Sequence, residues 1–183
     1  MRPMPTGSPA PEPPLSLADR FRVARRDVID VDGQRVRSVF ALPVPGASRL
    51  RIHRLASTND RPQGLHLGAS GGLAVNDQRA RDLVLWSSTA PTTVEMLVDT
   101  TESGLVHVWN SWMADGIEHA WLGNAGMLVD ADLTGANPVV QLSCSDGIGA
   151  ASFDDLVVGI EIVAHATPES DDRPSTGRVH SLR

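Results

Sequence analysis

The 183-residue chain contains no lysine and no tyrosine, and its single cysteine is Cys144. One cysteine can form neither an internal disulfide nor a multi-cysteine zinc site. No apolar run approaches the ~18–20 residues of a membrane-spanning helix, and residues 1–14 include no apolar block typical of a signal peptide. These absences predict a cytoplasmic protein without a membrane segment. Cys144 alternates with Val140 and Leu142, so we expect a buried, unreactive thiol.

The charges are divided unevenly along the chain. Residues 1–81 hold 13 arginines and 7 acidic residues, a net charge of +6, whereas residues 82–183 hold 3 arginines and 15 acidic residues, a net charge of −12. We expect arginines of the first half to pair with acids of the second, within the domain or between subunits of a homo-oligomer. Nucleic acid is disfavoured as a partner, because few aromatic residues accompany the arginines and no known nucleic-acid-binding motif is present.

Proline and polar residues mark both ends of the chain. Residues 1–14 hold six of the 13 prolines, and residues 167–183 are polar. This composition predicts a disordered proline-rich arm at 1–14, a single domain at 15–166 and a flexible polar tail at 167–183. Ser16 followed by Asp19 resembles a helix capping box, which predicts a short helix over 17–26. A strand is the alternative there, because apolar residues alternate with arginines over 20–23.

From residue 36 onward, apolar residues recur with period two in short runs separated by Gly, Pro, Asn and Asp. The runs cover residues 36–42, 50–53, 65–67, 73–75, 82–86, 92–99, 105–112, 117–122, 126–130, 139–144 and 156–162. No amphipathic helix long enough to connect parallel strands lies between them. The pattern predicts an all-β fold, an antiparallel β-sandwich that resembles a jelly roll, with at most one or two short helices.

All four tryptophans lie within residues 86–121. An Asp-Gly pair at 115–116, between two alternating runs, predicts a two-residue type I′ hairpin. Its register would pair Trp112 with His119 and Asn110 with Trp121. The four side chains that would then share one face are Asn110, Trp112, His119 and Trp121.

This hairpin face has two interpretations. Indole rings stack on the apolar faces of sugar rings while amide and imidazole groups bind hydroxyls, so the face would suit a glycan or a similar polar cyclic ligand. Val106, Val108 and Ile117 share the same face, however, which favours burial in the core. Both interpretations stay open at this point.

A glycine-rich acidic loop follows the predicted strand at 139–144. Asp146, Asp154 and Asp155 supply three carboxylates there, and hard oxygen ligands on a flexible backbone suit Ca²⁺. The alternative is that they are solvated turn residues or caps of the neighbouring backbone. A simple up-and-down strand order would place this loop far from the turn at 115–116.

The sequence carries no nucleophile elbow, phosphate-binding loop or dinucleotide fingerprint. The leading hypothesis is therefore a non-enzymatic β-sandwich binding module for a carbohydrate or a similar polar ligand. One alternative is a small metal-dependent, cupin-like β-barrel enzyme, although no His-x-His pair occurs. Another is a structural or assembly subunit without a small-molecule ligand, which requires both Trp112 and Trp121 to be buried.

Overall fold

A computed structural model describes residues 14–100, 104–135 and 138–164 of the chain. Its elements are α1 (Leu17–Ala24), β1 (Val28–Val31), β2 (Gln34–Arg37), β3 (Phe40–Pro43), β4 (Ala47–Ser57), β5 (Gln63–Val75), β6 (Gln78–Trp86), β7 (Thr93–Asp99), β8 (Leu105–Ala114), β9 (Ile117–His119), β10 (Gly126–Asp132), β11 (Val139–Ser145) and β12 (Leu156–Ala164). Nearly all of the predicted arm at 1–14, and the whole predicted tail at 167–183, lie outside the described residues. Within the described part, no helix is long and apolar enough to cross a membrane.

The predicted N-terminal helix is present as α1, and the alternative strand is wrong. Ser16 caps it, because its hydroxyl oxygen accepts a hydrogen bond from the backbone N–H of Asp19 at 3.2 Å. The helix ends at Arg25, whose left-handed backbone conformation stops the helical repeat. The backbone N–H of Leu17 donates to the Asn124 side chain at 3.1 Å, which ties the helix to the segment before β10.

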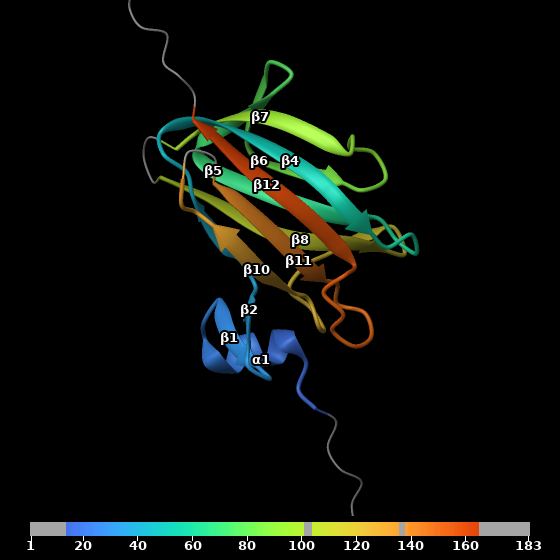
Figure 1. Cartoon of the computed structure of the whole chain (residues 1–183). Helices are drawn as coiled ribbons and strands as arrows, with labels where there is room; N and C mark the ends of the chain where they lie inside the picture. The colour runs from blue at the N-terminus through green and yellow to red at the C-terminus, as the bar shows by residue number, and fades with distance from the viewer. Residues whose placement is uncertain (1–13, 101–103, 136–137, 165–183) are drawn as a thin grey trace, which may run out of the picture.

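The strands form one antiparallel sheet in the order β1-β2-β10-β11-β12-β4-β7-β5-β8-β3, with β6 beside β5 and β9 beside β8. The long strand β5 pairs with β8 over residues 63–68, but with β7 at Leu73 and Ala74. The sheet folds over at this change of partner, so that the layer of β10, β11, β12, β4 and β7 faces the layer of β3, β8, β5 and β6 (Figure 1). The predicted all-β antiparallel class is confirmed. Jelly-roll connectivity is not confirmed, because the strands follow one continuous order.

The core lies between the two layers and is supplied by alternate residues of the strands. Val140, Leu142 and Cys144 of β11 are fully buried, as are Val106 and Val108 of β8. Burial raises the pKa of the Cys144 thiol far above its ordinary value, and the charge of Asp155 adds to the rise. The thiol is therefore the buried structural residue that the sequence predicts.

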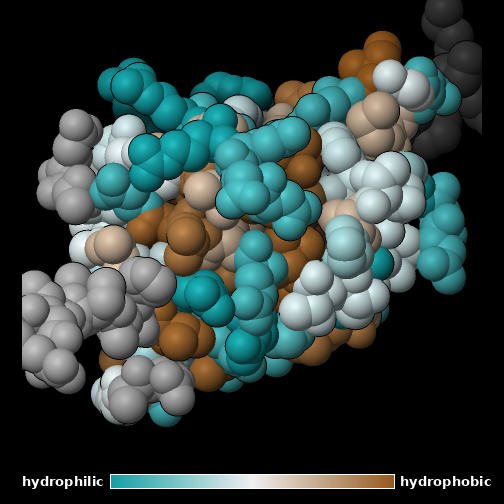
Figure 2. Space-filling model, turned by 90° about the horizontal axis from the view of Figure 1, so that it is seen from above, coloured by the Kyte–Doolittle hydropathy of each residue, from teal (hydrophilic) through white to brown (hydrophobic). Residues whose placement is uncertain are grey.

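Ion pairs cover the outer face of the β12-β4-β7 strands. Arg51 donates to Glu95 at 2.8 Å and to Glu161 at 3.1 Å, while Arg49 lies 3.5 Å from Glu95. Arginines from the first half of the chain thus pair with acids of the second half, as expected. Seen from above, the molecule presents many hydrophilic side chains with apolar residues showing between them (Figure 2).

Candidate binding surface

The predicted hairpin is present, with its predicted turn and register. Asp115 and Gly116 both have positive φ, as a type I′ turn requires. Trp112 pairs with His119 across β8 and β9, and their rings stack at 5.8 Å. The predicted pair of Asn110 with Trp121 is wrong, because β9 ends at His119.

The four hairpin residues therefore do not share one surface. Asn110 lies opposite Leu65 of β5, and its side chain donates to the Ser145 carbonyl oxygen at 2.9 Å. Asn110 and Trp112 are each only 3% exposed, whereas Trp121 is 50% exposed. Trp121 has a φ of +55°, and its ring stacks on Trp109. Trp109 lies on the face of β8 opposite to that of Asn110 and Trp112. The Trp121 side chain is therefore on this second face of the sheet, and not on the predicted one.

Trp112 is buried because the acidic loop covers it. A Cβ atom at Gly147 would overlap the Trp112 indole, so the backbone at 147 lies directly against that ring. The neighbouring Asp146 carboxylate is completely buried and accepts hydrogen bonds from Arg61 at 2.6 Å, Gln63 at 3.0 Å and the Ile148 backbone N–H at 2.8 Å. The simple up-and-down strand order, which would place this loop far from the turn at 115–116, is wrong, and the loop instead packs against Trp112, three residues before that turn. The strand order, which sequence periodicity does not determine, brings them together.

The predicted calcium site is not formed by the acidic loop. Asp155 accepts hydrogen bonds from the Asp146 backbone N–H at 2.9 Å and from Ser152 at 3.0 Å, while Asp154 is exposed. Protein donors therefore bind both carboxylate oxygens of Asp146 and one of Asp155. Within the described ranges, no group of three or more His, Cys, Asp or Glu side chains is placed to hold a metal ion. The alternative of backbone-capping acids describes Asp146 and Asp155 correctly.

A row of aromatic side chains crosses the outer face of the β6-β5-β8 layer. We call this row the aromatic strip, and its members are Trp86 of β6, His66 of β5, Trp109 of β8 and Trp121, which follows β9. His66 stacks on Trp109 with a centroid distance of 4.8 Å, and Trp109 stacks on Trp121 at 5.7 Å. Trp86 meets His66 edge-on at 6.4 Å with an interplanar angle of 80°. The strip therefore joins four chain segments into one aromatic surface.

Two glycines let the strip lie close to the sheet. A Cβ atom at Gly64 would stand 2.9 Å from the Trp86 ring, so the indole, which is partly buried, lies against the backbone of β5 there. At Gly68 the added atom would stand 2.6 Å from an Asp82 oxygen and 3.7 Å from the Trp109 ring. A larger residue at Gly64 would therefore displace the Trp86 ring, whereas one at Gly68 would displace Asp82 and only touch Trp109.

Hydrogen-bonding groups flank the aromatic rings. The Nε2 atom of His66 lies 2.9 Å from the Ser111 hydroxyl and 2.6 Å from a Glu118 carboxylate oxygen. A Ser-His-acid relay needs the serine on one ring nitrogen and the acid on the other. Both groups here meet the same nitrogen, so the arrangement is a polar edge to the strip and not a catalytic relay. At the far end, the Trp121 indole N–H donates to the Ser38 carbonyl at 3.3 Å.

The strip continues into a groove beside Trp121. This groove has a volume of about 380 Å³ and lies between α1 and the segment before β3. Phe21 and Val39 give it apolar walls, while Arg22 and Asp27 place charges beside them. A ligand on the strip could therefore extend past Trp121 along the surface.

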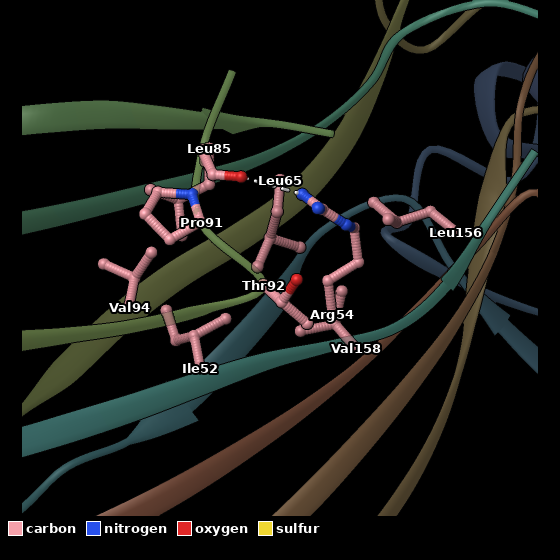
Figure 3. A pocket seen from close by; sticks show the side chains of 10 residues that line it. Ile52, Arg54, Leu65, Leu85, Pro91, Thr92, Val94, Leu156 and Val158 are labelled. Carbon is pink, nitrogen blue, oxygen red and sulfur yellow. Dashed lines mark hydrogen bonds between the residues drawn. The ribbon is translucent and has the colours of Figure 1, made fainter. Parts of the chain in front are cut away.

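A second hollow lies between the two layers and is too small for a ligand (Figure 3). Ile52, Leu65 and Val94 are among its apolar lining residues, and Arg54 crosses it to donate to the Ala90 carbonyl at 3.2 Å. Its volume is about 20 Å³, room for about one water molecule. The aromatic strip is the stronger candidate for a binding surface.

No protein-family model matches the chain, and no curated protein matches it in sequence. The geometry of the strip therefore supplies the functional argument. Sequence reasoning missed three of its members: His66, Trp86 and Trp109. The alternation along the predicted hairpin does place Trp109 on the other face of the strand from Trp112. Nothing in the sequence, however, shows that β8 lies next to β5, which carries His66, or that β5 lies next to β6, which carries Trp86.

Proposed function

We propose that this chain is a non-enzymatic β-sandwich binding module that takes a carbohydrate or a similar polar cyclic ligand on the aromatic strip. The observation that carries the proposal is the continuous row of ring contacts from Trp86 through His66 and Trp109 to Trp121, an indole that is half exposed. Such a ring offers an apolar surface to the face of a sugar ring. The exposed Glu118 carboxylate beside His66 is a hydrogen-bonding group suited to hydroxyls, whereas Ser111 is buried and holds the His66 ring from below.

The length of the strip favours an oligosaccharide over a single sugar. It runs from β6 across β5 to β8 and on to Trp121, and neighbouring strands are about 4.8 Å apart, so the four positions extend over roughly 15 Å. An elongated ligand would lie across the strands and meet aromatic and polar side chains in turn. The groove beside Trp121 prolongs this path.

The other two hypotheses have less support. A metal-dependent barrel enzyme requires converging ligands, which the described residues do not provide. An assembly subunit without a ligand requires Trp121 to be buried, whereas it is half exposed. The half-exposed Trp121 continues a row of partly buried aromatic rings on the sheet face, and a contiguous apolar surface of this kind is typical of a binding site.

Titration calorimetry with a panel of neutral, basic and acidic oligosaccharides tests the proposal. We expect at least one member to bind, and Trp86→Ala and Trp109→Ala each to weaken that binding about tenfold or more. Leu55→Ala is the matched control, because it removes an apolar side chain that is 59% exposed on β4, outside the strip. Failure of the whole panel to bind, or equal weakening by Leu55→Ala, would overturn the proposal.

A further inference from the structure

The segment of α1, β1 and β2 extends from one end of the two layers (Figure 1). The β1-β2 hairpin joins the rest of the sheet through a single ladder pair, Arg37 with Met127 of β10. β1 is the first strand in the order, and on its side away from β2 it has no strand partner among the described residues. This segment therefore presents an open strand edge.

A groove follows this edge. It has a volume of about 520 Å³ and lies between α1 and β1. Consecutive residues of β1, Val28 to Asp30, line it together with α1 residues, and since side chains alternate between the faces of a strand, the groove runs along the edge and not over one face. Leu15 and Val23 add apolar walls and are 63% and 76% exposed.

The backbone of β1 is turned toward this groove. The Asp30 carbonyl accepts a hydrogen bond from the Arg20 guanidinium of α1 at 2.8 Å, so this carbonyl points away from β2. The guanidinium stands where the N–H of an added strand would stand. A strand edge beside a helix, with apolar side chains at the rim, is the geometry that binds an extended chain by strand addition.

The charges around the groove favour an acidic occupant. Residues 15–37 hold six arginines and four aspartates, a net charge of +2. Arg20 and Arg26 line the groove against one acidic residue, Asp30, and Arg35 lines the neighbouring surface of β1. An added strand would therefore be most stable if it carried carboxylates beside apolar residues.

The same chain carries such a strand edge on β10. Beyond Met127, the side of β10 away from β11 has no strand partner in the part of the chain that the structure describes. This open stretch is 128–132, with apolar Leu128 and Val129 followed by exposed Asp130 and Asp132. It is one residue longer than β1, and its two aspartates would lie beside the arginines that line the groove, Arg20 and Arg26.

We propose that β1 of one copy of this protein pairs with the open edge of β10 in a second copy. The two edges differ, so the contact is head-to-tail, and each copy keeps one edge free for a further copy. Salt would weaken the association, because Arg20 and Arg26 at the groove of one copy would attract Asp130 and Asp132 of the next. This inference is independent of the ligand proposed for the aromatic strip.

Sedimentation velocity over a wide protein concentration series tests this pairing. We expect the full chain to form larger species as concentration rises, and Arg35→Glu or Asp130→Arg to weaken the association about tenfold or more. An equimolar mixture of the two variants should associate again, because the arginine edge of one meets the aspartate edge of the other. Asp154→Arg, an exposed site on neither edge, changes the net charge as Asp130→Arg does and is the matched control.

Three results would overturn the proposal. The wild-type chain could stay monomeric at every concentration. The control Asp154→Arg could weaken association as much as Asp130→Arg. The mixed variants could also fail to associate while circular dichroism shows both to be folded. Since all the substituted side chains are exposed, folding of the variants is expected to be intact.

Discussion

The two faces of β8 carry similar residue types and meet different surroundings. On the inner face, Trp112 is covered by the acidic loop, and the Asn110 amide donates to a buried carbonyl. On the outer face, Trp109 contacts His66 and Trp121, and Trp121 remains half exposed. A tryptophan therefore does not indicate which face of a strand is buried. The segment that packs over that face decides it.

The outer face of the other layer sharpens this contrast. There the strands present Arg51, Glu95 and Glu161, as expected for a sheet face in contact with water. Such a face needs no partner, because its charges pair with one another across neighbouring strands. The outer face of the β6-β5-β8 layer instead holds the four rings of the aromatic strip in contact, and this difference is why we propose the binding surface there.

The largest expected effect is the loss of the buried tryptophan. Trp112→Ala should lower the free energy of unfolding by about 3–5 kcal/mol, because it opens a cavity beneath the acidic loop. Trp121→Ala also removes an indole, but from the outer face, and should lower the free energy of unfolding by less than about 1 kcal/mol. Denaturant titration measures both. Similar losses for the two variants would contradict the inner and outer assignment.

The short-range features of the fold follow from the sequence. The Ser16 cap, the Asp-Gly turn with its Trp112 to His119 pair, and the period-two strands all depend on residues near one another in the chain. The predicted pair of Asn110 with Trp121 is the part of the hairpin register that the structure does not contain. The register rule assumes that both strands continue, and β9 stops after three residues.

The remaining features depend on contacts between distant segments. Asp146 binds Arg61 and Gln63, which lie more than 80 residues earlier in the chain. The aromatic strip likewise requires β5 to lie between β6 and β8, an order that no local pattern specifies. The calcium prediction used spacing within one loop, and that spacing contains no sign that Arg61 and Gln63, from elsewhere in the fold, bind the Asp146 carboxylate.

The second effect concerns the buried carboxylate on the inner side. Asp146→Ala should lower the free energy of unfolding by on the order of 3 kcal/mol, because the Gln63 amide is left buried without an acceptor and the loop over Trp112 loses its anchor. Asp154→Ala, an exposed residue of the same acidic region, should change it by less than about 0.5 kcal/mol.

A fluorescence readout adds detail to this second effect. Trp112 emission should shift to longer wavelength in native Asp146→Ala if the loop opens and admits water to the indole. The variants Trp86→Phe, Trp109→Phe and Trp121→Phe, combined in one background, would make Trp112 the only emitter. An unchanged unfolding free energy in Asp146→Ala would show that Asp146 does not hold the loop.

The smallest expected effect is on the charged outer face. A hydrogen bond from Arg51 holds the pKa of Glu95 below its ordinary value of 4.5. A carboxyl whose pKa is lower in the folded than in the unfolded protein stabilises the fold above its unfolded pKa, and this contribution is lost as the pH falls through the folded value. Glu95→Gln should therefore lower the melting temperature slightly at neutral pH and leave it unchanged at a pH below the folded pKa.

The partner substitution shows whether the Arg51 contact causes this pH dependence. Arg51→Gln should flatten the acid dependence of the melting temperature in the same way, and the double variant should flatten it little further, because the two single changes remove one interaction. Both side chains are well exposed, so added salt should weaken the effect in the wild type. Additive effects of the two substitutions, or an acid dependence of Glu95→Gln as steep as that of the wild type, would show that this outer face is stabilised by something other than its ion pairs.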